Sequence, residues 1–119
     1  MKLAAQIAAA LVGLLHVYFM VLEMFLWTRP FGRRSFGLTP EFAAASKSLA
    51  ANQGLYNGFL AAGIAWGLWL GEAGRGVTLF FLACVVVAGV FGAVTVSRKI
   101  LAVQGLPGTI ALVLVWLAA

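Results

Sequence analysis

Four long apolar blocks occupy most of this chain, and they restrict what it can fold into more than any other feature. They cover residues 3–28, 49–70, 77–103 and 106–118. With 64% hydrophobic and 9% charged residues, a water-soluble protein would have almost no wettable surface. The blocks therefore predict an integral membrane protein, and the short connections between them predict a single domain over residues 1–119.

The blocks favour helices over strands. In lipid, every backbone amide must be hydrogen-bonded within its own segment, and the blocks lack the alternation of a membrane barrel strand. A span needs roughly 20 apolar residues, so we predict an all-α, polytopic bundle of four transmembrane helices with a short fourth helix. The chain opens like a signal peptide, but its apolar run continues from Ala10 to Trp27, which favours a retained span.

The connection 29–48 is rich in basic residues and has one acid, Glu41. Its basic residues are Arg29, Arg33, Arg34 and Lys47. Thr39 and Pro40 are typical of a helix cap and a first-turn proline, and Glu41 of a first-turn acid. We therefore expect a helix to begin there, at the membrane interface, before it enters the bilayer.

The distribution of Lys and Arg predicts the orientation, because cytoplasmic loops are enriched in these residues. With four spans, the first and third connections share one side of the membrane. That side carries Arg29, Arg33, Arg34, Lys47, Arg98 and Lys99, and the opposite side carries Lys2 and Arg75. We predict a multi-pass protein of the cell (inner) membrane, with both termini outside and segment 29–48 cytoplasmic. Arg29, Arg33 and Arg34 are then expected to contact anionic headgroups, which explains the net charge of +5 without a nucleic-acid partner.

The first block contains two ionisable residues, His16 and Glu23, in a place where such side chains are costly. They are seven residues apart, which leaves them about 20 degrees from alignment on one helix face. Along the axis they are separated by about 10 Å, too far for a direct hydrogen bond. Each is therefore expected to meet another helix or water.

The second block opens with polar side chains that could meet Glu23. They are Asn52, Gln53, Tyr56 and Asn57. Because this block runs antiparallel to the first, its polar start lies at about the depth of Glu23, with Gln53, Tyr56 and Asn57 on one face. Together with His16 and Glu23, these four residues form a candidate site for a ligand or a proton. The alternative is that the amides serve only as hydrogen bonds between helices.

Small residues at four-residue spacing suit close helix packing. One line holds Gly54, Gly58 and Ala62, and the other holds Gly63, Gly67 and Gly71. Such surfaces pack against another helix of the chain or of a second copy, so we expect a homodimer. The sequence has no phosphate loop, nucleophile elbow, dinucleotide fingerprint or metal-ligand spacing, so we assign no catalytic residue, metal or cofactor.

The runs LEMFLWTRPFGRRSFGLTPEFA and LAANQGLYNGFLAAG, with the late turn VQGLPG, resemble a small, mostly bacterial four-helix membrane family. That family is known only as a domain of unknown function (DUF1304). The resemblance covers residues 16–108, and Gly108 stands where alanine is expected after Pro107. It implies four transmembrane helices with an intact set of His16, Glu23 and the Asn-Gln-Gly run, and it implies no activity.

Three functional hypotheses follow. The first is a small proton-linked transporter, or a binder of a small cationic or amphipathic molecule, in which Glu23 titrates, His16 relays protons and the second-block side chains orient the carboxylate. The second is a non-enzymatic accessory or scaffold protein that docks a partner or anionic lipid through the glycine lines and segment 29–48. The third is an intramembrane metal-dependent enzyme, which needs a donor beyond His16 and Glu23. None of the three identifies the ligand.

Overall fold

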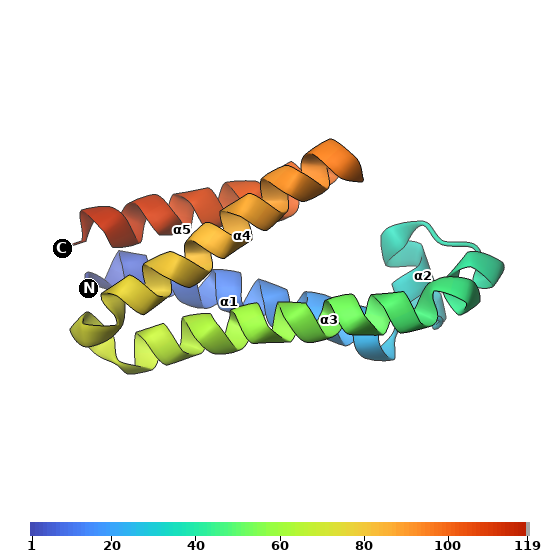
Figure 1. The fold of residues 1–119 in the computed structure, drawn as a ribbon, viewed down its shortest axis with the longest axis horizontal. Coiled ribbons are helices and arrows are strands. Elements are labelled where there is room, and N and C mark those ends of the chain that lie inside the picture. The colour runs from blue at the N-terminus through green and yellow to red at the C-terminus, as the bar shows by residue number, and fades with distance from the viewer. Residues whose placement is uncertain (119) are drawn as a thin grey trace. The chain divides into compact units, whose positions relative to one another are not determined.

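The computed structural model describes residues 1–118, and the regular elements in this part of the chain are all helices. The elements are α1 (Leu3–Phe25), α2 (Pro30–Phe36), α3 (Pro40–Trp69), the 3-10 turn η1 (Gly71–Gly74), α4 (Arg75–Thr95), the π-helical turn η2 (Leu101–Gly105) and α5 (Leu106–Leu117) (Figure 1). The predicted all-α class is confirmed.

Helix α3 begins where the sequence predicted a helix start. The hydroxyl of Thr39 accepts a hydrogen bond from the Phe42 backbone N–H at 3.1 Å, with Pro40 and Glu41 in the first turn. This cap satisfies one of the free N–H groups at the helix start. The second apolar block, 49–70, is therefore the later part of a 30-residue helix and not a separate element.

Two boundaries differ from the apolar blocks. Connection 29–48 contains an additional short helix, α2, which ends at Gly37 with φ 65°. The third block was predicted to run to residue 103, but α4 ends at Thr95, and residues 101–105 belong to η2. There the Leu106 N–H donates to the Leu101 carbonyl, five residues earlier, immediately before Pro107. Because proline has no N–H to donate, the regular helical ladder is interrupted at this position.

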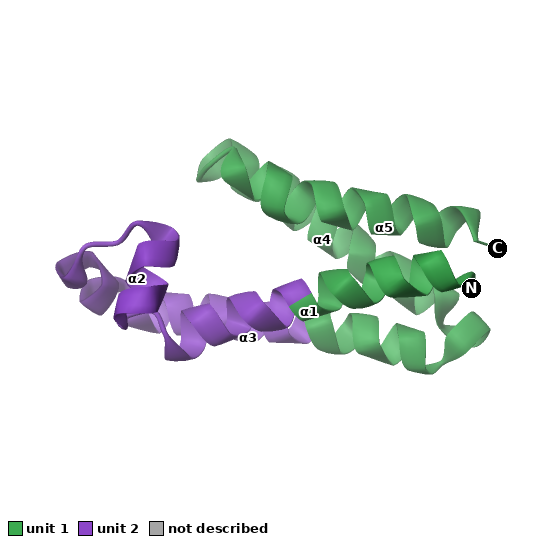
Figure 2. Ribbon diagram, turned by 180° about the vertical axis from the view of Figure 1, so that it is seen from behind, with its two compact units in different colours: residues 1–14, 60–119 green, residues 15–59 purple. Residues whose placement is uncertain are grey.

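The chain divides into two compact units (Figure 2). Unit 1 comprises residues 1–14 and 60–119, and unit 2 comprises residues 15–59. Helices α1 and α3 each contribute residues to both units, so this division leaves the prediction of a single domain undecided.

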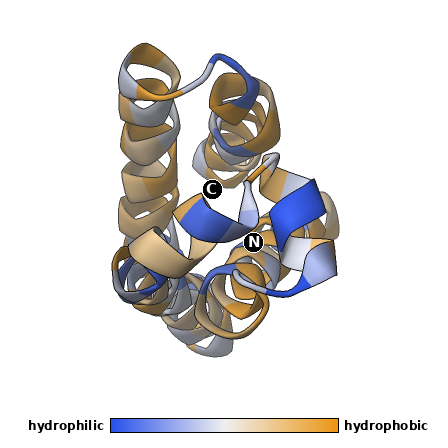
Figure 3. Cartoon of the chain, turned by 90° about the vertical axis from the view of Figure 1, so that its right-hand side faces the viewer, coloured by the Kyte–Doolittle hydropathy of each residue, from blue (hydrophilic) through white to orange (hydrophobic). Residues whose placement is uncertain are grey.

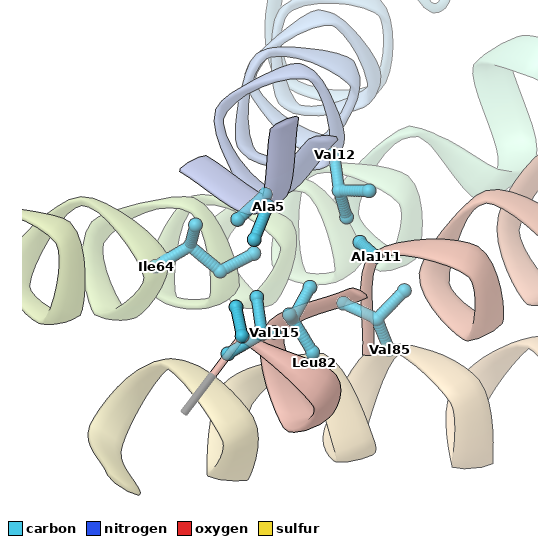
Figure 4. Packing of buried hydrophobic residues seen from close by; sticks show 9 residues of the cluster. Ala5, Val12, Ile64, Leu82, Val85, Ala111 and Val115 are labelled. Carbon is cyan, nitrogen blue, oxygen red and sulfur yellow. The ribbon is translucent and has the colours of Figure 1, made fainter. Parts of the chain in front are cut away.

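Unit 1 has a hydrophobic core built from four helices. It contains Ala5, Ala9 and Val12 of α1, Ile64 of α3, Leu82 and Val85 of α4, and Ala111, Val115 and Ala118 from α5 and its end (Figure 4). Most of these side chains are small or β-branched, so the helices that carry them can approach closely.

Polar contacts bring three chain segments together at one end of unit 1. The N-terminal ammonium group of Met1 pairs with Glu72 of η1. Arg75, the first residue of α4, donates through Nε to the Val115 carbonyl at 3.3 Å and through Nη2 to the Trp116 carbonyl at 2.5 Å. Its guanidinium lies 5.6 Å from the centroid of the Trp116 ring. These bonds supply donor partners to carbonyls at the end of α5, where the Val115 carbonyl also accepts from the Ala118 N–H at 3.3 Å.

Two helices are long and apolar enough to cross a membrane. They are Leu3–Phe25 and Gly71–Thr95, and Leu101–Leu117 is a shorter apolar helix. Helix α3 does not meet the same criterion, because Asn52, Gln53 and Asn57 lower the hydropathy of its second half. Four spans therefore stay a prediction, of which two have this support.

Candidate functional site

In unit 2, the end of α1 packs antiparallel against α3 through two glycines. A Cβ atom on Gly54 would lie 2.6 Å from Met24 Cγ and 3.1 Å from Glu23 Cβ. A Cβ atom on Gly58 would lie 2.9 Å from Met20 Sδ. A side chain at Gly54 would force Met24 to shift and would crowd the Met20 carbonyl at 3.1 Å, and one at Gly58 would displace the Met20 thioether. The two glycines therefore allow α1 and α3 to approach closely.

This close packing brings Glu23 to Asn57. The Asn57 Nδ2 atom donates a hydrogen bond to Glu23 Oε1, and both side chains are half-buried. Asn57 directly precedes Gly58, where the absence of a side chain leaves room for Met20. The close approach of the two helices at Gly58 therefore also brings the Asn57 amide within reach of the Glu23 carboxyl group. The contact expected from the antiparallel arrangement is therefore present, while its functional role stays a prediction.

The other amides and the tyrosine of the predicted site lie elsewhere on α3. Asn52, Gln53 and Tyr56 are exposed, and among the described residues Asn57 is the one whose side chain bonds to Glu23. Gln53 and Tyr56 each precede a residue that faces α1, namely Gly54 and Asn57, and one residue turns a helix by about 100 degrees. Of the six residues predicted to form the site, the structure thus joins Glu23 and Asn57 by a hydrogen bond.

His16 is fully buried in the chain. Its ring meets the Phe19 ring edge-on, with centroids 5.5 Å apart and an interplanar angle of 76°. His16 and Glu23 follow the same stripe of α1, separated by about 10 Å. Two polar groups thus lie about two turns apart on one helix face.

The position of Glu23 in α1 favours a positive partner. Glu23 lies in the last turn of α1, where the helix carries a partial negative charge. The ion pair that the described residues contain joins Met1 and Glu72, so no side-chain cation neutralises Glu23 there. The contact with Asn57 uses Glu23 Oε1 and Asn57 Nδ2, which leaves Glu23 Oε2 and Asn57 Oδ1 as acceptors for a ligand. The pair can therefore receive a proton, a small cation or a group with N–H donors.

The described residues contain no group of three or more His, Cys, Asp and Glu side chains that could hold a metal ion. The intramembrane enzyme hypothesis needs a donor beyond His16 and Glu23, and the described part of the chain supplies none as a cluster.

Four of the predicted packing glycines contact other helices of the chain, and Gly71 does not. Gly54 and Gly58 face methionines of α1 in unit 2. In unit 1, a Cβ on Gly63 would collide with the Phe81 ring, and one on Gly67 with Thr78. Ala62 of the first line is exposed, so the expected homodimer and the scaffold hypothesis stay predictions.

The sequence analysis did not predict that two methionines of α1 pack beside Glu23 against the glycines of α3. Met20 and Met24 fill the space above Gly58 and Gly54 and hold Glu23 against α3. The signal was present, because Met20 lies on the same stripe of α1 as His16 and Glu23.

Comparisons with known proteins give a family and one relative. The family model described as "Protein of unknown function (DUF1304)" matches residues 10–116. The chain is also similar to the "Uncharacterized protein YpaA" of Lactococcus lactis subsp. lactis (strain IL1403), with 28% identity over 107 residues, covering 88% of this chain and 90% of the relative. No solved structure matches.

Proposed function

Since the chain belongs to the DUF1304 family, whose description assigns no activity, we propose a function from its own residues: a small integral membrane protein that binds a small organic cation at Glu23 and exchanges it for a proton. The observation that carries the proposal is the hydrogen bond from Asn57 to the half-buried Glu23 carboxyl group inside an apolar helix.

Exposed apolar side chains support a location in the bilayer. Among the large apolar residues, Leu14 and Phe25 are each 64% exposed, Trp69 88%, Phe91 69% and Val94 80%. Soluble monomers rarely expose apolar surface on this scale. Apolar colours dominate the helices, and hydrophilic stretches gather mainly in α2 and the turns (Figure 3). Together with the two helices of spanning length, this surface suits lipid, and α3 and residues 101–117 would complete four spans.

A carboxyl group inside a membrane span is more consistent with a functional role than with a purely structural one. Ionisable groups inside membrane spans are costly and mark ion or substrate pathways by default. If Glu23 served only as a hydrogen-bond partner for Asn57, glutamine would do the same at lower cost. A carboxyl group adds the ability to hold either a proton or a cation, but not both at once.

Competition for one carboxyl group gives a simple exchange cycle. A cation that reaches Glu23 from one side displaces the proton, which leaves to water, and a proton arriving from the other side later releases the cation. Asn57 Nδ2 donates to the Glu23 carboxyl group in both states, and the buried His16 on the same stripe provides a second proton-accepting group along α1. Glu23 thus couples the flux of the cation to that of the proton.

Replacing Glu23 with glutamine should abolish this exchange and preserve the fold, because glutamine retains an acceptor for Asn57. The protein would be reconstituted into vesicles with an imposed pH gradient of either sign, and ethidium entry followed by its fluorescence on enclosed DNA. We expect gradient-driven ethidium uptake by the unmodified chain and none by Glu23→Gln. Glu41→Gln, the same change at an exposed acid of unit 2, is the matched control and should transport normally. Equal pH-driven uptake by both variants would refute the proposal.

A further inference from the structure

A cluster of unpaired basic side chains lies in unit 2, in a segment that the Glu23 site does not use. Its members are Arg29, Arg33, Arg34 and Lys47, of which Arg29, Arg34 and Lys47 are exposed. The acids of unit 2 are Glu23, which bonds to Asn57, and Glu41, in the first turn of α3. No ion pair among the described residues involves any of the four basic side chains, so their charge is left for a partner.

Helix α2 carries the arginines in a well-defined backbone conformation. Pro30 sits in its first turn, and Gly37 ends it in the left-handed conformation, with the Leu38 N–H donating to the Arg33 carbonyl at 2.9 Å. Gly32 packs so closely on the Leu26 carbonyl that no side chain would fit there. The arginines are therefore carried by a defined turn.

Trp27 fastens this turn to α3. Its indole Nε1 donates to Ser46 Oγ at 3.0 Å, and its ring lies 4.9 Å from the Phe36 ring, centroid to centroid. Ser46 belongs to α3 and Phe36 to α2, so one side chain holds both helices.

Aromatic side chains emerge beside the cations. Phe31 is 49% exposed, Phe36 41% and Phe42 57%. Aromatic rings next to basic residues are typical of segments that lie at a membrane surface, where the rings enter the interface and the charges meet headgroups. A soluble anion would use the charges and leave the rings exposed to water.

The arginines suit a phosphate group in particular. The Arg33 Nε atom is buried, and the described residues provide no hydrogen-bond acceptor for it. Arginine binds phosphate through a planar fork of N–H donors, which lysine lacks. The Arg33 guanidinium group thus has an N–H donor without an acceptor in the described part of the chain.

We propose that α2 and the turn into α3 form a binding site for an anionic phospholipid. Arg29, Arg33 and Arg34 bind the headgroup phosphate, and Phe31 and Phe36 lie among the adjoining glycerol and upper acyl groups. The site anchors unit 2 to the anionic leaflet, independently of what Glu23 binds.

The test measures lipid binding by the whole chain purified in a neutral detergent. Dihexanoyl-phosphatidylglycerol, dihexanoyl-phosphatidylcholine and inorganic phosphate would each be titrated by calorimetry. Each basic residue near an anionic surface contributes about fivefold in affinity, so Arg29→Gln/Arg33→Gln/Arg34→Gln should weaken phosphatidylglycerol binding about 100-fold. Arg98→Gln/Lys99→Gln, which removes the basic pair between α4 and η2 in unit 1, is the matched control and should bind as the unmodified chain does.

The expected result is saturable binding of phosphatidylglycerol, little binding of phosphatidylcholine, and loss only in the triple variant. Equal binding of the two lipids, or equal loss in the control, would overturn the proposal. Tight binding of inorganic phosphate alone would also overturn it, since the site would then take a soluble anion. If the triple variant fails to fold, Arg34→Gln at an exposed position should still lose about fivefold, and no loss there would refute the site.

Discussion

Leucine in place of Gly89 is expected to prevent unit 1 from folding normally. Gly89 is buried in α4, and a Cβ atom there would lie 2.6 Å from both the backbone N and the Cα of Gly105 in η2. Backbone atoms cannot move aside as a side chain can, so α4 and η2 would have to separate. Overpacking of this kind costs about 3 kcal/mol or more when the backbone has to shift.

Gly76→Leu provides the matched control in the same helix. Gly76 is exposed, and no atom lies within 4 Å of the position of its added Cβ. Leucine is also the better helix former, so this variant should be as stable as the unmodified chain or slightly more so. Both would be compared by denaturant unfolding in detergent and by size-exclusion chromatography. If Gly89→Leu behaved like Gly76→Leu, the close contact between α4 and η2 would be wrong.

Asn57→Leu should destabilise unit 2, because it removes the donor to Glu23 and leaves the half-buried Oε1 atom without its hydrogen bond. A buried acceptor left without its partner costs about 1–3 kcal/mol, and we expect a loss of that size in the unfolding free energy. Asn52→Leu makes the same chemical change at an exposed position of α3 and should cost far less.

A double-mutant cycle separates this bond from general packing effects. Glu23→Leu combined with Asn57→Leu leaves neither partner unsatisfied, so the double variant should lose less than the sum of the two single losses. Strict additivity, or equal stability of Asn57→Leu and Asn52→Leu, would show that the carboxyl–amide contact does not stabilise unit 2.

Local signals in the sequence predicted the parts of this structure that depend on neighbouring residues. Thr39, Pro40 and Glu41 located the start of α3, because a cap and a first-turn proline act within a few residues. The contact between Glu23 and Asn57 followed from antiparallel connectivity and depth alone.

Features that depend on packing were missed. The polar run Ser97, Arg98 and Lys99 marks the end of α4 at Thr95, but the apolar residues that follow it, up to Val103, led us to extend the third block too far. The choice of Asn57 over Gln53 depends on the rotation of α3, which is set by Met20 and Met24 packing on Gly58 and Gly54. Periodicity cannot fix a rotation when polar residues occupy neighbouring faces.

The most direct test of the central claim counts the protons released when a cation binds. Ethidium would be added to the detergent-purified chain in weak buffer, and proton release recorded with a pH-sensitive dye beside the amount of ethidium bound. If Glu23 exchanges a proton for the cation, the unmodified chain releases protons in proportion to bound ethidium and Glu23→Gln releases none. Ethidium binding with the same proton release in both proteins would contradict the assignment of Glu23 as the exchange site.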